Sequence, residues 1–232
     1  MTRNTRVDDV TSYILDAIAD GRFPPGEQLP GEEKLAEFAD ASRLTLREAV
    51  KTLAAQGILR PVQGRGTFVN PVERWISLDA IMRVRQGSAK DAILQLVEVR
   101  GFLEIGAAEG FARNATDAEI DALAGHLDTM REAHAAGDVT AVMEADLAFH
   151  HVIIEGSGNP FIAAAMAPLA KVLADARRAT SAIPQMRAHA IDEHTKILKA
   201  VSERDGAAAR SAMRSHMRQT RRDTEAYVAD DN

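Results

Sequence analysis

The chain has 232 residues, of which 46% are apolar and 27% charged, and its formal net charge is −6. This length allows one large domain or two modest ones, and the composition excludes a disordered or fibrous chain. The sequence contains no cysteine, which excludes disulfides, thiolate zinc sites and cysteine nucleophiles. No apolar run approaches the roughly 18 residues of a membrane helix, and the first residues carry no apolar export signal, so we expect a cytoplasmic protein.

The first 70 residues predict three helices followed by a β-hairpin. Apolar residues spaced three and four apart indicate an amphipathic helix over 10–18. A short helix over 31–38 follows a proline-rich turn, and a third helix begins after Ser42, a good N-cap residue. Two short strands, over 58–62 and 67–69, enclose a glycine-containing turn. This order of elements is that of a winged helix-turn-helix.

Basic side chains are concentrated in the third helix and the hairpin. Residues 43–65 contain a single acidic residue, Glu48, and five basic ones: Arg43, Arg47, Lys51, Arg60 and Arg65. Residues 71–232, by contrast, contain 19 basic and 24 acidic residues. A short basic patch on an otherwise acidic chain predicts one local anionic partner. The alternative is that these side chains only keep an exposed helix solvated.

DNA is the anionic partner that this arrangement favours. A helix-turn-helix lays its second helix, here the third of the chain, in the major groove. Arg43 and Arg47 lie one turn apart on that helix, and arginine can bind a guanine edge or a phosphate through two hydrogen bonds. Thr45 is short enough for a base or backbone contact. At the hairpin tip Gly66 lets the backbone approach the duplex, and Arg65 can enter a minor groove.

The remainder of the chain predicts a linker and a helical domain. Residues 71–88 are expected to be a linker that contains Pro71, Trp75 and Gly87. From Ala89 onward the pattern is helical, and its breaks predict six helices, or seven if the first is broken. Long helices with short loops indicate an all-α bundle. The expected domains are therefore 1–70, a mostly α winged helix-turn-helix, and 89–232, an all-α six- or seven-helix bundle.

Four polar residues fall on the apolar faces of the predicted bundle helices. Asp146 and His150 are four residues apart on one helix, and His194 and His216 lie on two others. A buried polar group without a partner costs about 1–3 kcal/mol. One divalent ion would satisfy all four groups, and the mixed nitrogen and oxygen set suits zinc, with nickel, manganese or iron as alternatives. Spacing alone leaves open that each histidine is a core residue bonded to a carbonyl or to water.

One arginine and four further histidines also occur in the predicted bundle. Arg100 shares an apolar face with Glu104, which it can reach as an i, i+4 neighbour. The alternative role for Arg100 is to bind the carboxylate of an effector beside the metal. The remaining four histidines lie off the inward faces and are interpreted as surface or structural residues: His126, His134, His151 and His189.

A run of residues at fixed spacings extends over residues 8–70. It comprises Phe23-Pro24-Pro25-Gly26, Leu29-Pro30, Leu35-Ala36, Ser42-Arg43, Leu46-Arg47-Glu48-Ala49, Leu53, Gly57-Ile58-Leu59 and Gly64-Arg65-Gly66-Thr67-Phe68-Val69. This run resembles the DNA-binding domain of GntR-family transcription regulators. Two positions depart from the family pattern: Gly31 replaces the usual Ser, and Leu44-Thr45 replaces the common Thr-Pro. The second departure can alter base preference.

A second set of residues lies within 89–228. It consists of Asp146 and His150 with Phe149 between them, Ser157-Gly158-Asn159, His194 and His216. This set resembles the effector-binding FCD domain of the FadR-type subfamily. The resemblance implies an all-α bundle with a metal held by one aspartate and three histidines. It also implies a small carboxylate effector, such as a hydroxy acid or a sugar acid.

Together these features predict a ligand-responsive, DNA-binding transcription regulator rather than an enzyme. We expect a repressor that a small carboxylate releases from its operator. A single winged helix buries little surface, so useful affinity requires a homodimer on two half-sites of double-stranded DNA. Two alternatives remain: a metal-dependent enzyme that acts on a small carboxylate, and a bundle in which the metal is purely structural.

Overall fold

The computed structural model describes residues 6–84 and 88–229. Residues 1–5, 85–87 and 230–232 lie outside the described part, and with them Gly87 of the expected linker. The chain divides into two compact units, Met1–Gln86 and Gly87–Asn232, each of which is described by itself.

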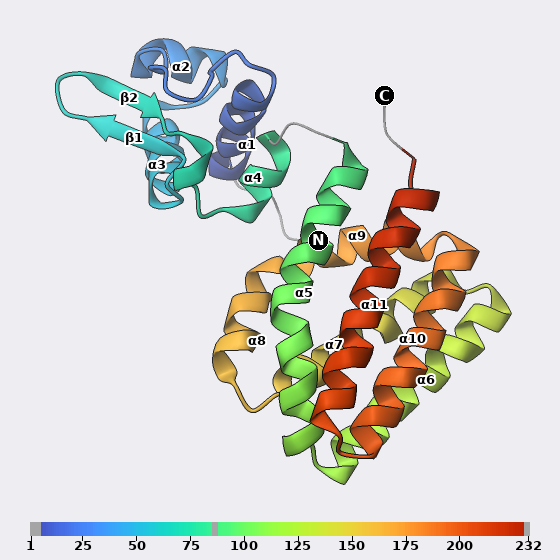
Figure 1. The fold of residues 1–232 in the computed structure, drawn as a ribbon. Helices are drawn as coiled ribbons and strands as arrows, with labels where there is room; N and C mark the ends of the chain where they lie inside the picture. The colour runs from blue at the N-terminus through green and yellow to red at the C-terminus, as the bar shows by residue number, and fades with distance from the viewer. Residues whose placement is uncertain (1–5, 85–87, 230–232) are drawn as a thin grey trace. The chain divides into compact units, whose positions relative to one another are not determined.

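The first unit contains the expected three helices and hairpin, together with one further helix (Figure 1). Its elements in chain order are α1 (Arg6–Ala19), α2 (Glu32–Phe38), α3 (Arg43–Ala55), β1 (Leu59–Val62), β2 (Gly66–Val69), the 3-10 turn η1 (Val72–Arg74) and α4 (Leu78–Val84). The element order and the two-stranded wing agree with the winged helix-turn-helix predicted from the sequence.

The apolar faces of α1 and α3 close the core of this unit. Ile14 of α1 and Leu46 and Leu53 of α3 are almost completely inaccessible to solvent. The N-terminus of α3 is capped as predicted, because the backbone N–H of Thr45 donates a hydrogen bond to the Ser42 hydroxyl. Since the inward face of α3 is apolar, its basic residues are left on the outer face.

The wing is an antiparallel hairpin that is buried at its base and exposed at its tip. Leu59 pairs with Val69 at the buried end, and Val62 pairs with Gly66 at the tip. Gly66 has a backbone φ of +100°, a conformation that residues other than glycine rarely adopt. A Cβ at this position would also meet the side-chain nitrogen of Gln28 at 2.4 Å. The tip therefore requires glycine at this position.

The described part of the expected linker, 71–84, packs on the first unit. Trp75 is buried, and its indole N–H donates to the backbone carbonyl of Asn70 over 3.0 Å. Ala80 of α4 is fully buried against the same core, and Arg83 forms an ion pair with Asp16 of α1. Burial of these apolar side chains explains why this segment is ordered structure and not an extended connection.

The second unit is an all-α bundle (Figure 1). Its elements are α5 (Ala89–Asn114), α6 (Asp117–Ala136), α7 (Val139–Glu155), α8 (Pro160–Met166), the 3-10 turn η2 (Ala167–Leu169), α9 (Ala170–Ser181), α10 (Pro184–Ser202) and α11 (Gly206–Tyr227). Helix α11 packs along α5 and α10, and α6 packs along α7. This packing encloses Phe111, Leu127, Phe149 and Ile153 in the centre of the bundle.

The described bundle contains seven helices, but the extra one arises in a place that the sequence prediction did not name. The first bundle helix, α5, is unbroken, whereas the fourth predicted helix is divided into α8, η2 and α9. Pro168 lies at this division. Proline lacks a backbone N–H and its ring clashes with the carbonyl four residues earlier, so an α-helix cannot continue straight through it.

Side chains cap the long helices at their beginnings. The side chains of Ser88 and Thr116 each accept a backbone N–H from the residue three positions later, Asp91 and Glu119, whose carboxylates bind back to the capping residue. Gly137 ends α6 in the left-handed conformation. Within the described residues, no helix is both long and apolar enough to cross a membrane.

Candidate functional site

The outer face of α3 carries the two arginines that the sequence assigned to DNA. The side chains of Arg43 and Arg47 are 61% and 63% exposed. Each forms an ion pair with a glutamate of α2: Arg43 with Glu33, and Arg47 with Glu32 at 2.8 Å. Exposed ion pairs of this kind contribute only about 0–1 kcal/mol, so the guanidinium groups can exchange them for contacts with DNA.

Thr45 lies on the same helix and has a structural role as well. Its hydroxyl lies 2.8 Å from the hydroxyl of Ser42, within the cap of α3. The neighbouring Leu44 is 70% exposed, at a position where the family pattern commonly has a threonine. Lys51, which the sequence placed on the basic face, pairs with Glu48 one turn away at 2.8 Å.

The tip of the wing is held by a residue that the sequence analysis missed. The side-chain amide of Gln28 donates a hydrogen bond to the backbone carbonyl of Arg65 over 2.7 Å. The backbone of Gln28 also bridges to Phe68 of β2. The arginine side chain itself remains exposed. Gly66 was the only sequence signal for this contact, because a glycine there permits the close approach of another side chain.

Three histidines from three helices meet in the centre of the bundle. His150 of α7, His194 of α10 and His216 of α11 are at most 5% exposed. One ring nitrogen of each lies within 4.8 Å of the others. The Nε2 atoms of His150 and His194 are 3.1 Å apart. Two nitrogens bound at about 2.0–2.1 Å to one zinc ion lie roughly 3 Å apart, so this spacing suits a shared ion.

A glutamate orients the first of these histidines. Nδ1 of His150 lies 2.6 Å from a carboxylate oxygen of Glu104 on α5. Because an ionised carboxylate can only accept, Nδ1 carries the proton and Nε2 presents its lone pair to the centre of the cluster. The spacing along α5 indicates Glu104 only as a partner of Arg100, because His150 lies on a different helix.

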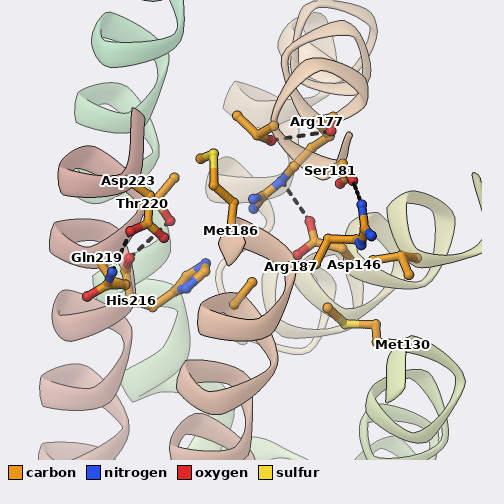
Figure 2. A pocket seen from close by; sticks show the side chains of 13 residues that line it. Met130, Asp146, Arg177, Ser181, Met186, Arg187, His216, Gln219, Thr220 and Asp223 are labelled. Carbon is orange, nitrogen blue, oxygen red and sulfur yellow. Dashed lines mark hydrogen bonds and ion pairs between the residues drawn. The ribbon is translucent and has the colours of Figure 1, made fainter. Parts of the chain in front are cut away.

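Asp146 lies beside the histidines but is shared with an arginine. One carboxylate oxygen is 3.6 Å from Nε2 of His194, and the other is 2.7 Å from Nε of Arg177 on α9. Figure 2 shows Arg177 reaching toward Asp146. The side chain of Arg177 is 9% exposed, and its NH2 atom has no hydrogen-bond partner among the described residues. No spacing in the sequence indicates this contact, because Arg177 and Asp146 lie on different helices.

Arg100 is buried and paired with Glu104, which is the local pairing that the sequence allowed. Its Nε and NH2 atoms donate to the two carboxylate oxygens over 2.6 and 3.1 Å. The same NH2 atom is 3.1 Å from Nε2 of His150. Arg100 therefore lies directly against the nitrogen that the geometry makes available to a metal.

The burial of the histidines keeps them neutral. Burial is the main reason that the pKa values of His194 and His216 lie well below the usual value for imidazole. Burial also lowers the pKa of His150, although the charge of Glu104 acts in the opposite direction. Neutral imidazole is the form that coordinates a metal ion.

The pKa values of the two buried carboxylates, Asp146 and Glu104, are also lowered, and for a carboxylate this favours the ionised form. Burial by itself raises the pKa of Asp146, but the nearby charges, first that of Arg177, outweigh it and the pKa lies below its usual value. For Glu104, burial likewise raises the pKa, but the charge of Arg100 and the hydrogen bond from His150 outweigh it and leave the pKa far below the usual range. Burial lowers the pKa of Arg177 to about 10, so its guanidinium group is still charged at neutral pH.

Unpartnered nitrogen atoms in the cluster leave room for an additional partner such as a metal ion. Both ring nitrogens of His216, and Nδ1 of His194, are buried without a hydrogen-bond partner among the described residues. An unsatisfied buried polar atom costs about 1–3 kcal/mol, and an ion would remove this cost for one of the two nitrogens of His216. At His194 the nitrogen that lies next to His150 is Nε2, so the unpartnered Nδ1 would not be a ligand. Three imidazoles and the Asp146 carboxylate form a donor set that suits zinc and similar divalent ions.

Two hollows adjoin the histidine cluster. A small pocket of about 30 Å³ is lined by polar residues that include His216, Asp146, Arg177, Arg187 and Asp223, and by apolar residues such as Met130 and Met186 (Figure 2). A much larger cavity, of about 510 Å³, lies between α5, α7 and the segment from α8 to α9. It is bordered by Arg100, Glu104, His150 and Arg177.

The remaining histidines do not join the cluster. Nδ1 of His189 lies 3.1 Å from Asp223, and Nδ1 of His134 accepts a hydrogen bond from Arg187 over 3.3 Å. The side chain of His151 is 71% exposed and points away from its neighbour His150. His126 lies on α6 with a half-buried side chain. These positions agree with the interpretation of the four histidines as surface or structural residues.

Comparison with known proteins covers both units. The model for bacterial regulatory proteins of the gntR family matches residues 6–69, and the FCD domain model matches residues 95–219. The HTH-type transcriptional regulator LutR of Bacillus subtilis is 30% identical over 86% of this chain and 92% of its own length. The HTH-type transcriptional repressor NanR of Citrobacter rodentium is 31% identical over 84% of this chain and 76% of its own.

A solved structure is also similar to both units of this chain. Streptococcus agalactiae GntR is 30% identical to this chain and superposes with a TM-score of 0.52, over 93% of this chain and 99% of that one. The matching families and relatives are transcription regulators and not enzymes, which removes the metal-dependent enzyme as an alternative. The chain therefore belongs to the gntR family of bacterial regulatory proteins and is a DNA-binding transcription regulator with an FCD domain.

Proposed function

We propose that this regulator is a repressor whose FCD unit holds a divalent metal ion and releases DNA when a small carboxylate binds beside that ion. The observation that carries the proposal is the buried cluster of His150, His194 and His216, in which one ring nitrogen of each lies within 4.8 Å of the others and His150 borders a cavity large enough for a ligand. One relative is named the HTH-type transcriptional repressor NanR, and this name supports repression rather than activation.

Asp146 and the three histidines are the groups that would hold the ion. When bound, a zinc ion or a similar divalent cation supplies a Lewis-acidic centre that attracts an anion. Glu104 keeps the His150 ring in the orientation that directs Nε2 to the cluster. Arg177 holds the second oxygen of Asp146 and so fixes the direction of the first.

The charges around the cluster favour an anionic effector. Arg100 and Arg177 balance Glu104 and Asp146, and the histidines are neutral. A divalent ion therefore adds two positive charges that no described neighbouring side chain compensates. A carboxylate supplies negative charge at this point, and Arg100, which lines the cavity, is the group best placed to bind it.

Binding to the operator would use the outer face of α3 and the tip of the wing. Arg43, Thr45 and Arg47 face the major groove in this assignment, and Arg65 and Gly66 face the backbone or minor groove. The small surface of one winged helix requires two copies on two half-sites, so we propose a homodimer on a pseudo-palindromic operator.

The test combines elemental analysis with operator binding. Protein prepared without chelator or a nickel column is expected to contain about one divalent ion per chain. His150→Ala is expected to lose the ion and the effector response but to keep operator binding, whereas the control His126→Ala keeps all three. Metal far below one ion per chain that zinc, nickel or manganese does not restore would refute the site. Metal loss with an intact effector response would make the ion structural.

A further inference from the structure

The large cavity beside the histidine cluster has an unusual division between polar and apolar walls. Its apolar residues come from α7 and from the segment α8 to α9: Leu147, Ala148, Ile154, Ala163, Met166, Ala167, Ala170 and Leu173. Its buried polar residues all belong to the cluster around the proposed metal: Arg100, Glu104, His150 and Arg177. The other two polar lining residues, His151 and Glu155, have side chains that are 71% and 56% exposed.

Size sets a lower limit on the ligand. The cavity measures about 510 Å³, which lies within the roughly 300–1,000 Å³ typical of small-molecule sites. An acid of two or three carbon atoms would contact the cationic end but leave the apolar walls uncovered. A ligand that fills the cavity needs a body of several further carbon atoms.

The walls also discriminate by polarity. A hydroxyl placed against Leu147, Ile154 or Leu173 would lose its water and gain no hydrogen-bond partner from these side chains, which weakens binding. Each methylene group buried in the same place strengthens binding about fourfold. Both effects act against a sugar acid and in favour of an acid with an apolar tail.

We infer that the effector of this regulator is a monocarboxylate with an apolar body, whose head group binds at Arg100 and the metal while its body fills the cavity under α8 and α9. This inference rests on the proposed function, because it takes the effector to bind beside the histidine cluster. It narrows the effector class expected from the family resemblance, in which hydroxy acids and sugar acids stood together. Arg177, whose NH2 atom is buried without a partner, is the second cationic group available to the head group.

The test measures calorimetric binding of a ligand series to the full-length, zinc-loaded protein. The probes are acetate, butanoate, hexanoate and octanoate, with lactate and gluconate as polar comparisons. Affinity is expected to rise about fourfold per methylene until the cavity is filled. Hexanoate is expected to bind more tightly than lactate or gluconate and to release the protein from the DNA upstream of its own gene.

A substitution that fills the cavity locates the site. Ala170→Phe on α9 places a bulky side chain in the cavity and is expected to weaken hexanoate binding at least tenfold, with unchanged zinc content. The matched control is Ala179→Phe on the same helix, because both alanines are exposed but only Ala170 lines the cavity. Unchanged hexanoate affinity in Ala170→Phe would overturn the assignment of the cavity.

The remaining outcomes separate the two proposals. If lactate or gluconate binds more tightly than hexanoate and His150→Ala abolishes that binding, the apolar-body inference is wrong and the proposed function stands. If none of the six acids binds the zinc-loaded protein or affects its release from DNA, the proposed function itself fails.

Discussion

Removal of the arginine that pairs with Asp146 is the sharpest test of the buried charge arrangement. In the metal-free protein, Arg177→Met replaces a guanidinium group by an apolar side chain of similar length. Asp146 is then left as a carboxylate that is 4% exposed and has lost its ion pair. Removing one partner of a buried ion pair costs about 3–5 kcal/mol, and that is the loss in unfolding free energy that we expect.

Arg178→Met is the matched control for this substitution. Arg178 is the next residue of α9, its side chain is 67% exposed, and its partner Asp175 is 60% exposed. An exposed pair of this kind contributes at most about 1 kcal/mol. The two variants therefore make the same chemical change at adjacent positions, one buried and one in solvent.

The assay is urea unfolding in the presence of a chelator, followed by two signals. Far-ultraviolet circular dichroism reports mainly on the long helices of the second unit. The only tryptophan, Trp75, is buried in the first unit, so its fluorescence is expected to show the same transition in both variants. A loss below about 1 kcal/mol in Arg177→Met, or equal losses in the two variants, would refute the reasoning. Added zinc is expected to reduce the loss, because the ion supplies positive charge beside Asp146.

Three further predictions concern DNA binding and stability. Arg43→Ala and Arg47→Ala are each expected to weaken operator binding by about 1–3 kcal/mol per half-site in mobility-shift titrations at fixed salt, and normal affinity in both would contradict the assignment of α3. Arg65→Ala is expected to lower the slope of log affinity against log salt by about one per half-site, so an unchanged slope would mean that the wing does not contact phosphate. Hydrogen bonds from the backbone and hydroxyl of Thr116 lower the pKa of Glu119, so this carboxylate stabilises the fold above its unfolded pKa and the contribution disappears as pH falls through the lower folded pKa. The difference in melting temperature between the native chain and Glu119→Gln should therefore shrink between about pH 5 and about pH 3, and a constant difference would argue against the capping role.

Helical periodicity explains why the three histidines at the centre of the bundle could be predicted from the sequence. The faces of α7, α10 and α11 follow from the spacing of their apolar residues, so the inward direction of His150, His194 and His216 follows as well. Spacing within one helix says nothing about which other helix lies opposite. For that reason Arg177, which meets Asp146 across two helices, was not found.

The structure also differs from the sequence prediction in the first unit and at Pro168, and these differences have other causes. The short helix α4 has too few residues for a clear periodic signal, and its burial depends on a tertiary contact with α1. Gln28 could not be assigned to the wing because its partner is a backbone carbonyl 37 residues away. The division at Pro168 was within reach of sequence reasoning, since an internal proline ends or kinks an α-helix.

The ion pairs between α2 and α3 affect how the protein searches for its operator. Glu32 and Glu33 hold the same guanidinium groups that α3 would present to DNA. A phosphate met at random must compete with these carboxylates, and it gains only the difference between two exposed ion pairs, each of which is weak. A guanine edge in the major groove adds two directed hydrogen bonds that the glutamates do not match in geometry. Binding to random sequence and to the operator would both break the same two ion pairs, so the glutamates would lower both affinities by the same amount. The ratio that determines how much of the protein is found at its site among the rest of the genome would then rest on the directed hydrogen bonds to guanine.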